Sequence, residues 1–391
     1  MDVKAIILIG GRTERAAELE AERIAEVPIA LIDVLGEPVL QRVLWHLERV
    51  GITGASVVTE VPHSAAPLAR GALRPDLKFV HAVGPQFWRA AENAFAEAAQ
   101  AGAETVVVVR IGPYAEIDYE ELIQVHVDSG CRVSSACDME GEPLDCFVIS
   151  ALRRNDAAFL FRHELRQFRV PGDEYRVQGY VNRLRTAADL RRLALDAFAG
   201  TASIRPQGTE IKPGVWAGEG ARVHRRARVL APAFIGARSR VGAMSVITRG
   251  SVLEHHAEVD CGTVIENATV LPFTSVGAAL DVSHSVVGFR QIANLRRKVD
   301  VQIGDPKLVG VTSGSAPLRT VTSAVRLAFY LPITFIAGLF KTPARTIPEN
   351  LPEAVSTPST ALRTASLPEA EASDSNGFSP NFAAVRRYGN E

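Results

Sequence analysis

The stretch that decides the fold begins Ala221-Arg222-Val223-His224-Arg225-Arg226-Ala227-Arg228-Val229 and continues to Leu271. Within it, an aliphatic residue recurs at every sixth position without a miss. Two positions before each of these residues stands a small one, Ala, Ser or Thr. The aliphatic positions are Val223, Val229, Ile235, Val241, Ile247, Leu253, Val259, Ile265 and Leu271.

A period of six fits neither an α-helix, which repeats every 3.6 residues, nor the two-residue alternation of an ordinary strand. It is typical of a left-handed β-helix built from hexapeptide repeats, in which each hexad forms one face of a triangular coil. The aliphatic residue fills the interior, and the small residue fits the crowded position beside it. We therefore predict a left-handed β-helix domain at 201–305, with repeats over 211–290 and further faces near Ile211 and Val287.

The first 200 residues follow a different pattern. Short aliphatic runs at 5–9, 55–59, 77–82 and 105–109 alternate with stretches of helical apolar spacing at 37–50 and 88–101. Buried strands that alternate with helices predict an α/β domain with a parallel sheet at 1–200. The first run ends in Gly10-Gly11, and ligands of open α/β sheets bind at such carboxyl ends of strands.

The chain beyond residue 305 carries a hydrophobic segment and a polar tail. The segment at 327–340 is shorter than the ~20 residues that a membrane-spanning helix needs, and Pro332 interrupts it. Within 306–340 it therefore either packs against the β-helix or a partner subunit, or attaches the protein to a membrane surface. Residues 341–391 are rich in Pro, Ser, Thr, Ala and Glu, which predicts a disordered tail. The basic flanks of the segment are Arg319, Arg326, Lys341 and Arg345.

Composition narrows the classes of function. The 43 Lys and Arg residues nearly balance the 44 Asp and Glu residues, so the formal net charge is -1. Without an overall positive field, a dedicated nucleic-acid binder is excluded. The 4 cysteines form no CxxC pair, and we predict no metal site from them. Met1 leads straight into the first aliphatic run, so we expect no secretory signal and a cytoplasmic protein, associated with membranes if 327–340 attaches it.

A strand ending in Gly-Gly and a later hexapeptide β-helix together resemble the sugar-phosphate nucleotidyltransferases, over residues 3–290. The family includes the glucose-1-phosphate and mannose-1-phosphate nucleotidylyltransferases, which join a nucleoside triphosphate to a sugar 1-phosphate and release pyrophosphate. The resemblance implies a Rossmann-like nucleotide-diphospho-sugar transferase domain. It is carried by the first strand and loop at 4–11, the segment 34–40, the segment 116–130, and the turn at 186–190 that matches the family's Thr-Pro-Glu-Asp.

The residues that the family uses for phosphate and metal are largely replaced. Its Gly-Gly-x-Gly-Thr-Arg loop reads Gly10-Gly11-Arg12-Thr13-Glu14-Arg15 here, so Thr13 replaces the third glycine and Glu14 adds a carboxylate. Ile29 stands at the position of the family's phosphate-binding lysine.

The two metal-binding aspartates of the family are also absent. The strand that should end in Gly-Asp reads Val109-Arg110-Ile111-Gly112, and Arg183 stands at the second aspartate position. The resemblance thus implies no Mg²⁺ cofactor unless the active alternative holds. The candidate ligand-binding residues are Gly10, Gly11, Arg15, Arg110 and Arg183, with Arg15 as the candidate phosphate contact.

Several interpretations of these positions stay open. Arg110 and Arg183 either form ordinary ion pairs with Glu116 or another acid, or bind a phosphate-bearing ligand in place of the metal. An active enzyme with a rearranged site would rely on Arg15 and on an acid such as Glu14, Glu116 or Asp118. A hexapeptide-repeat acyltransferase is a further alternative, as is an interaction protein that works through the β-helix. The candidate acyltransferase histidines are His224, His255, His256 and His284.

The sequence therefore favours a nucleotidyltransferase-like protein of nucleotide-sugar metabolism that is catalytically degenerate. We expect a regulatory or scaffold subunit, or a nucleotide-sugar binder, in polysaccharide or cell-envelope synthesis. Expected partners are a nucleotide or nucleotide-sugar and further subunits, as a homo-oligomer or with an active homologue. The alternative is an active sugar-1-phosphate nucleotidylyltransferase.

Overall fold

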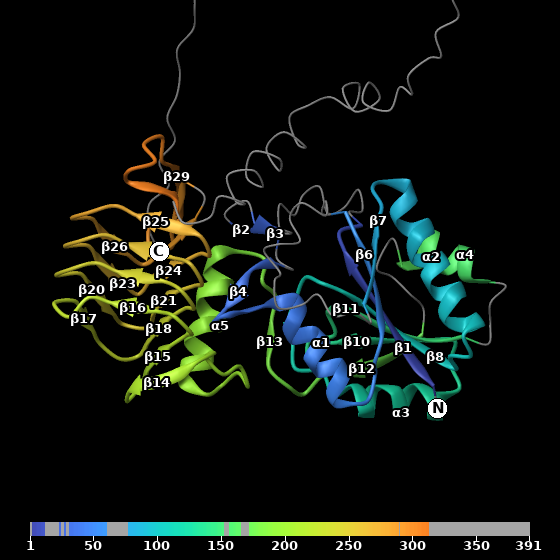
Figure 1. Ribbon diagram of the computed structural model, residues 1–391. Helices are drawn as coiled ribbons and strands as arrows, with labels where there is room; N and C mark the ends of the chain where they lie inside the picture. The colour runs from blue at the N-terminus through green and yellow to red at the C-terminus, as the bar shows by residue number, and fades with distance from the viewer. Residues whose placement is uncertain are drawn as a thin grey trace, which may run out of the picture. The chain divides into compact units, whose positions relative to one another are not determined.

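The computed structural model describes residues 2–11, 31–60, 77–151, 156–165, 172–288 and 290–312, and the backbone of the short strands at 23–24 and 27–28 (Figure 1). The chain divides into two units, Met1–Pro332 and Ile333–Glu391, and all described residues belong to the first. The segment 327–340 and the tail 341–391 lie outside the described residues. No helix in the described ranges is long and apolar enough to cross a membrane.

A seven-stranded sheet forms the centre of the N-terminal domain, in the order β12-β10-β11-β8-β1-β6-β7. Strands β1, β6, β7 and β8 run parallel, as the sequence predicts, whereas β11 runs antiparallel to both of its neighbours. Ile6 and Ile7 of β1 are both fully buried, as expected where helices cover both faces of a sheet. The strands are β1 (Val3–Ile9), β6 (Ala55–Thr59), β7 (Lys78–His81), β8 (Thr105–Arg110), β10 (Val133–Cys137), β11 (Pro143–Ser150) and β12 (Asp173–Arg176).

Helices cover both faces of this sheet. Successive residues of a strand point to opposite faces, so Ile7 and Val107 pack with residues of α1 and α3, while Ile6 and Val108 pack with residues of α2 and η5. The helical stretches predicted at 37–50 and 88–101 correspond to α1 and α2. The helices are α1 (Val39–Arg49), α2 (Pro85–Gln100), α3 (Tyr119–Ser129), the short α4 (Ala157–Phe159), the π-helical turn η5 (Leu160–Glu164) and α5 (Ala187–Ala199).

Three small antiparallel pairs complete the N-terminal part. Strands β4 and β5 form a hairpin whose two-residue turn, Leu35-Gly36, has positive φ at both positions (55° and 94°). Such turns match the twist of the flanking strands. The pairs are β2 (Arg23–Ile24) with β3 (Val27–Pro28), β4 (Asp33–Val34) with β5 (Glu37–Pro38), and β9 (Tyr114–Ala115) with β13 (Val181–Asn182).

Residues 209–311, which we call the coil region, consist of short strands in three parallel stacks. Each strand of a stack pairs with the strand that the chain forms one turn of the coil region later. Val223 thus pairs with Val241, and Val241 pairs with Val259. The parallel stacks are β15-β18-β21-β24-β27, β16-β19-β22-β25 and β17-β20-β23-β26. Antiparallel strands flank them: β14 lies beside β15, β28 and β29 continue from β27, and β30 lies beside β25.

The strands of the coil region contain two to four residues each. The first turn has β14 (Thr209–Lys212), β15 (Val215–Ala217), β16 (Arg222–Val223) and β17 (Arg228–Val229), and the second has β18 (Ala233–Ile235), β19 (Arg240–Val241) and β20 (Val246–Thr248). The third has β21 (Ser251–Leu253), β22 (Glu258–Val259) and β23 (Val264–Glu266), and the fourth has β24 (Thr269–Val270), β25 (Thr274–Val276) and β26 (Asp281–Ser283). The last strands are β27 (Ser285–Gly288), β28 (Gln291–Asn294), β29 (Val299–Gln302) and β30 (Val309–Val311).

The predicted aliphatic column forms the interior of the coil region, with one correction. Val241, Ile247, Leu253, Val259 and Ile265 are 0–3% exposed and belong to one core cluster. The ninth member is wrong. Leu253 pairs with Val270, so the hexad after Ile265 is one residue short and Val270 takes the interior position. Leu271 is buried instead against the N-terminal domain.

The ends of the predicted repeat also differ. Val223 is 37% exposed and Ile211 is 51% exposed, because the first turn has no turn of chain before it within the described residues. Val287, predicted as a further face, is fully buried and pairs with Val270.

The N-terminal domain and the coil region share one hydrophobic cluster. This cluster contains residues of α1 and α5 together with four residues of the coil region. Three of these lie on strands of the first stack and one directly follows β24: Phe234, Val252, Val286 and Leu271. Arg191 of α5 is 3% exposed and donates to Asn267 Oδ1 (2.9 Å) and to the backbone oxygen of Arg249 (3.3 Å).

Candidate functional site

The turn after β1 is held by a carboxylate from the neighbouring strand. Glu60 follows β6, and its Oε2 accepts a hydrogen bond from Gly11 N at 3.1 Å, while its Oε1 accepts one from Gly84 N at 3.3 Å. Gly84 is the N-cap of α2, where a negative charge is favourable. A single carboxylate thus joins the ends of β1 and β6 to the start of α2.

Both glycines of this turn are required by the geometry. Gly10 has a φ of 117°, and a Cβ there would lie 2.5 Å from Glu60 Oε2. Gly11 has a φ of 80°, and its Cβ would lie 2.6 Å from Phe87 Cε1. The backbone N–H that a phosphate would use in a Gly-rich loop therefore already binds an internal anion. Arg15, Thr13, Glu14 and Ile29 lie outside the described residues.

Arg110, at the carboxyl end of β8, is bound by a second carboxylate. Its Nε and one terminal nitrogen lie 3.2 and 3.1 Å from Asp145 Oδ2 on β11, and both side chains are about 15% exposed (15% and 14%). A Cβ on Gly112 would lie 3.8 Å from the same Asp145 oxygen. Asp145 therefore stands beside the position where the family resemblance places a metal-binding aspartate.

Arg183, which directly follows β13, is bound by a third carboxylate. It donates to Pro143 O at 2.8 Å and forms an ion pair with Asp138, in the turn between β10 and β11. Asp138 also accepts hydrogen bonds from the backbone N–H groups of Glu140 (3.1 Å) and Glu142 (2.8 Å). Burial raises the pKa of Asp138, but these hydrogen bonds and the Arg183 charge outweigh it and hold the pKa below its usual value.

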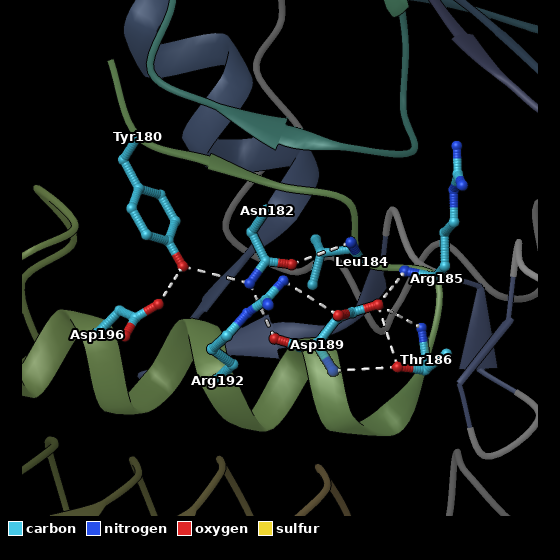
Figure 2. A network of polar contacts seen from close by, with 8 residues as sticks. All are labelled: Tyr180, Asn182, Leu184, Arg185, Thr186, Asp189, Arg192 and Asp196. Carbon is cyan, nitrogen blue, oxygen red and sulfur yellow. Dashed lines mark hydrogen bonds and ion pairs between the residues drawn. The ribbon is translucent and has the colours of Figure 1, made fainter. Parts of the chain in front are cut away.

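The turn after Arg183 is a structural one, as Figure 2 shows. Thr186 caps α5: its hydroxyl accepts from Asp189 N at 3.2 Å, and Asp189 Oδ2 accepts from Thr186 N at 3.1 Å, which completes a capping box. Asn182 donates to the Tyr180 hydroxyl, and that hydroxyl donates to Asp196 at 2.6 Å. The segment that matches the family's Thr-Pro-Glu-Asp turn therefore fixes the start of a helix.

The candidate residues are thus brought together only in part. Gly10 and Gly11 lie at the end of β1, and Arg110 lies on the adjacent strand, paired with Leu8. The ion-pair interpretation of the two arginines agrees with the contacts, with Asp145 and Asp138 as the acids. Glu116, the acid named for that role, instead accepts from Ser203 N at 2.5 Å. The assignment of these residues to ligand binding stays a prediction.

The residues present do not fit a magnesium ion. The carboxylate nearest to the Gly112 position is that of Asp145, and it is already bound to Arg110. Across the described ranges, no three His, Cys, Asp or Glu side chains lie close enough together to hold a metal. Among the described residues near Gly112, no free carboxylate therefore supplies the oxygen ligands that Mg²⁺ prefers.

The candidate acyltransferase histidines have other contacts. His255 Nδ1 forms a short contact with the Asp33 carboxylate of β4, and its ring packs edge-on to Phe273 at 4.7 Å. His284 Nδ1 lies 2.7 Å from Asn267 Nδ2, and His224 Nδ1 accepts from Arg226 N at 3.1 Å. His256 stacks on Phe273. None of these contacts forms a Ser–His–acid or Cys–His arrangement within the described residues.

Sequence reasoning missed Glu60, Asp145 and Asp138. Glu60 could have been found, because it directly follows a predicted strand at the carboxyl edge of the sheet, where ligands bind. No sequence pattern indicates Asp138 and Asp145. They lie in the β10–β11 hairpin, which is antiparallel, whereas the sequence predicts a parallel sheet.

Comparisons with known proteins do not establish a family. No family model matches the chain, and no curated protein matches it. Among solved structures, HddC from Yersinia pseudotuberculosis is similar at 16% sequence identity and a TM-score of 0.37, over 49% of this chain and 97% of that one. At this level the likeness does not identify what the present chain does.

Proposed function

We propose that this chain is a nucleotidyltransferase-like protein of nucleotide-sugar metabolism that is catalytically degenerate. It acts as a regulatory or scaffold subunit, or as a nucleotide-sugar binder, in polysaccharide or cell-envelope synthesis. The observation that supports this most is the Glu60 carboxylate on Gly11 N, at the place where a phosphate would bind.

Electrostatics explains why this contact opposes catalysis. A triphosphate needs backbone donors, cationic side chains and a bridging metal ion to offset its charge. Here the Gly11 donor serves Glu60, the Arg110 charge serves Asp145, and the Gly112 position offers no metal ligand. Each 1.36 kcal/mol of lost transition-state stabilisation lowers the rate tenfold, so we expect turnover at least ~10³-fold below that of an intact enzyme.

The finer architecture and setting belong to the same proposal. We propose that the coil region winds as a left-handed β-helix, that the protein is cytoplasmic, and that it forms a homo-oligomer or assembles with an active homologue. We further propose that 327–340 mediates partner or peripheral membrane contact. The hexad pattern and the composition of these segments support these points.

The decisive experiment measures pyrophosphate release from the common nucleoside triphosphates with glucose 1-phosphate or mannose 1-phosphate and Mg²⁺. We expect no release above background, and unchanged nucleotide binding when EDTA replaces Mg²⁺. A turnover number in the ordinary enzyme range of ~1–10³ s⁻¹ would refute the proposal in favour of an active nucleotidylyltransferase.

A variant tests the role of Glu60 directly. Glu60→Ala frees Gly11 N and removes a negative charge from the turn, so nucleotide affinity should rise several-fold without any gain in turnover. The matched control is Glu104→Ala, an exposed glutamate directly before β8 and therefore at the other end of the sheet from the Gly10-Gly11 turn. Equal nucleotide affinities for the wild type and Glu60→Ala would show that Glu60 does not obstruct a phosphate site.

A further inference from the structure

The first turn of the coil region has two uncovered strand edges. Strand β14 lies beside β15, but β16 and β17 are the first strands of their sheets, with no neighbour on the outer side within the described residues. The N–H groups of Arg222 and His224 donate to backbone oxygens of the next turn at 2.8 and 3.0 Å. By strand alternation, the polar backbone groups of Val223 between them face the uncovered side.

Apolar side chains are exposed at the same end. Val223 is 37% exposed, whereas its counterparts in the next two turns, Val241 and Val259, are 3% exposed or less. Leu230, directly after the inward Val229, is 47% exposed. Ile211 of β14 adds a further exposed apolar side chain at 51%. Repeat proteins normally protect such terminal turns with a polar cap. The aliphatic interior is therefore left open at this end.

Arginine dominates the charge around this opening. Residues 219–240 contain six arginines and one acid, Glu219. The arginines are Arg222, Arg225, Arg226, Arg228, Arg238 and Arg240, and all are exposed. Arg240 lies 3.8 Å from Glu258, and none of the other five forms an ion pair with a described residue. Together with the open strand edges, these five unpaired guanidinium groups favour an acidic partner.

The register shows how an acidic strand would fit. Arg222 pairs with Arg240, and Arg240 pairs with Glu258, so an arginine meets a glutamate one turn further along the stack. A groove of about 940 Å³ runs along the outer face of these strands, from Arg222 past Glu258 to Lys307. On the other edge strand, Arg228 likewise stands directly before an inward aliphatic residue, Val229. Both open edges thus present the same Arg-Val pair, six residues apart.

We propose that β16 and β17 bind an extended acidic segment of a partner protein, which adds one more turn to the coil region. Its strands carry Glu or Asp opposite Arg222 and Arg228, and an aliphatic residue directly after each acid covers Val223 and Val229. Backbone hydrogen bonds supply affinity and the acid–arginine pairs supply specificity, as in other cases of strand addition. A second copy of this end is excluded as the occupant, because arginines would face arginines.

The test uses the full-length protein and two synthetic peptides. The acidic peptide has two hexads of Ser-Glu-Val-Gly-Asn-Gly, and the basic peptide has Lys in place of each Glu. We expect the wild type to bind the acidic peptide about ten-fold more tightly than the basic one, and this preference to weaken at high salt. Arg222→Glu with Arg228→Glu should reverse the preference.

The controls separate this proposal from its alternatives. Arg296→Glu with Arg297→Glu, two exposed arginines in the turn between β28 and β29, should leave peptide binding unchanged. If the double variant Arg222→Glu with Arg228→Glu unfolds at the same denaturant midpoint as the wild type, its altered peptide preference does not result from misfolding. Equal binding of both peptides, or a preference unaffected by the exchange, would overturn the proposal. So would Arg222-dependent binding to phosphatidylserine vesicles without peptide binding, since it would assign these arginines to a membrane.

Discussion

Three carboxylates decide what the arginines and glycines of the predicted site can do. Glu60 binds Gly11 N, Asp145 binds Arg110, and Asp138 binds Arg183. In each case a carboxylate of this chain already binds the N–H donor or the guanidinium group that the proposed function would assign to a phosphate. A buried charge that loses its partner is costly, so these contacts connect the chemistry of the site to the stability of the domain.

A comparison of two neighbouring arginines tests this connection. Arg183→Ala removes the bonds to Asp138 and Pro143 O, and should lower the free energy of unfolding by about 1–3 kcal/mol. The Arg185 side chain is 48% exposed and lies 4.0 Å from Glu142, so Arg185→Ala should change the free energy of unfolding by less than about 0.5 kcal/mol. Denaturant unfolding gives both values. If Arg183→Ala is neutral for stability but abolishes nucleotide binding, Arg183 is a ligand contact rather than a structural ion pair.

At the scale of single elements, strand positions could be predicted from sequence more fully than strand register. The hexads place strands at Val241, Ile247 and Leu253 because each aliphatic residue must be buried. The hexads fail at Val270 and Leu271. Because both residues are aliphatic, the sequence does not show which of them is the interior residue, and the loss of one residue from the hexad goes unnoticed. The hairpin of β10 and β11 was missed for a related reason: its pairing with β8 and β12 depends on distant strands.

A pair of substitutions on β19 tests the interior of the coil region. Val241 is 3% exposed, so Val241→Asp would bury an unpaired carboxylate and should cost several kcal/mol. Arg240 is the adjacent residue and its side chain is 63% exposed, so Arg240→Asp should have a small effect on thermal unfolding. If Val241→Asp melts cooperatively at the wild-type temperature, the assignment of the aliphatic column to the interior is wrong.

At the scale of the whole molecule, the β4–β5 hairpin joins the N-terminal domain to the coil region. Glu254 is 1% exposed and accepts hydrogen bonds from Leu35 N (2.8 Å) and Gly36 N (2.9 Å) at the tip of that hairpin. The neighbouring His255 contacts Asp33, whose Oδ1 is buried with no hydrogen-bond partner among the described residues. Two positions adjacent in the coil region thus bind one hairpin. No local motif indicates this contact, because 219 residues separate Leu35 from Glu254.

The protonation of Glu254 makes the stability of the molecule depend on pH. Burial, with a contribution from Asp33, raises its pKa from 4.5 to about 8. Between these two values the folded protein keeps a proton that the unfolded chain releases. This contribution to stability is therefore complete below pH 4.5, falls as the pH rises toward 8, and is absent above it.

The variant Glu254→Gln isolates this effect, because glutamine keeps the shape of the protonated side chain but does not titrate. From pH 5 to pH 8, the unfolding free energy of the wild type should fall steadily relative to that of Glu254→Gln, by up to ~1.4 kcal/mol per pH unit. Denaturant unfolding at a series of pH values measures it, and the subtraction cancels the titration of His46 and His126, whose pKa values burial lowers. A difference that stays constant with pH would mean that Glu254 is ionised in the folded protein, held as a carboxylate by the N–H groups of Leu35 and Gly36.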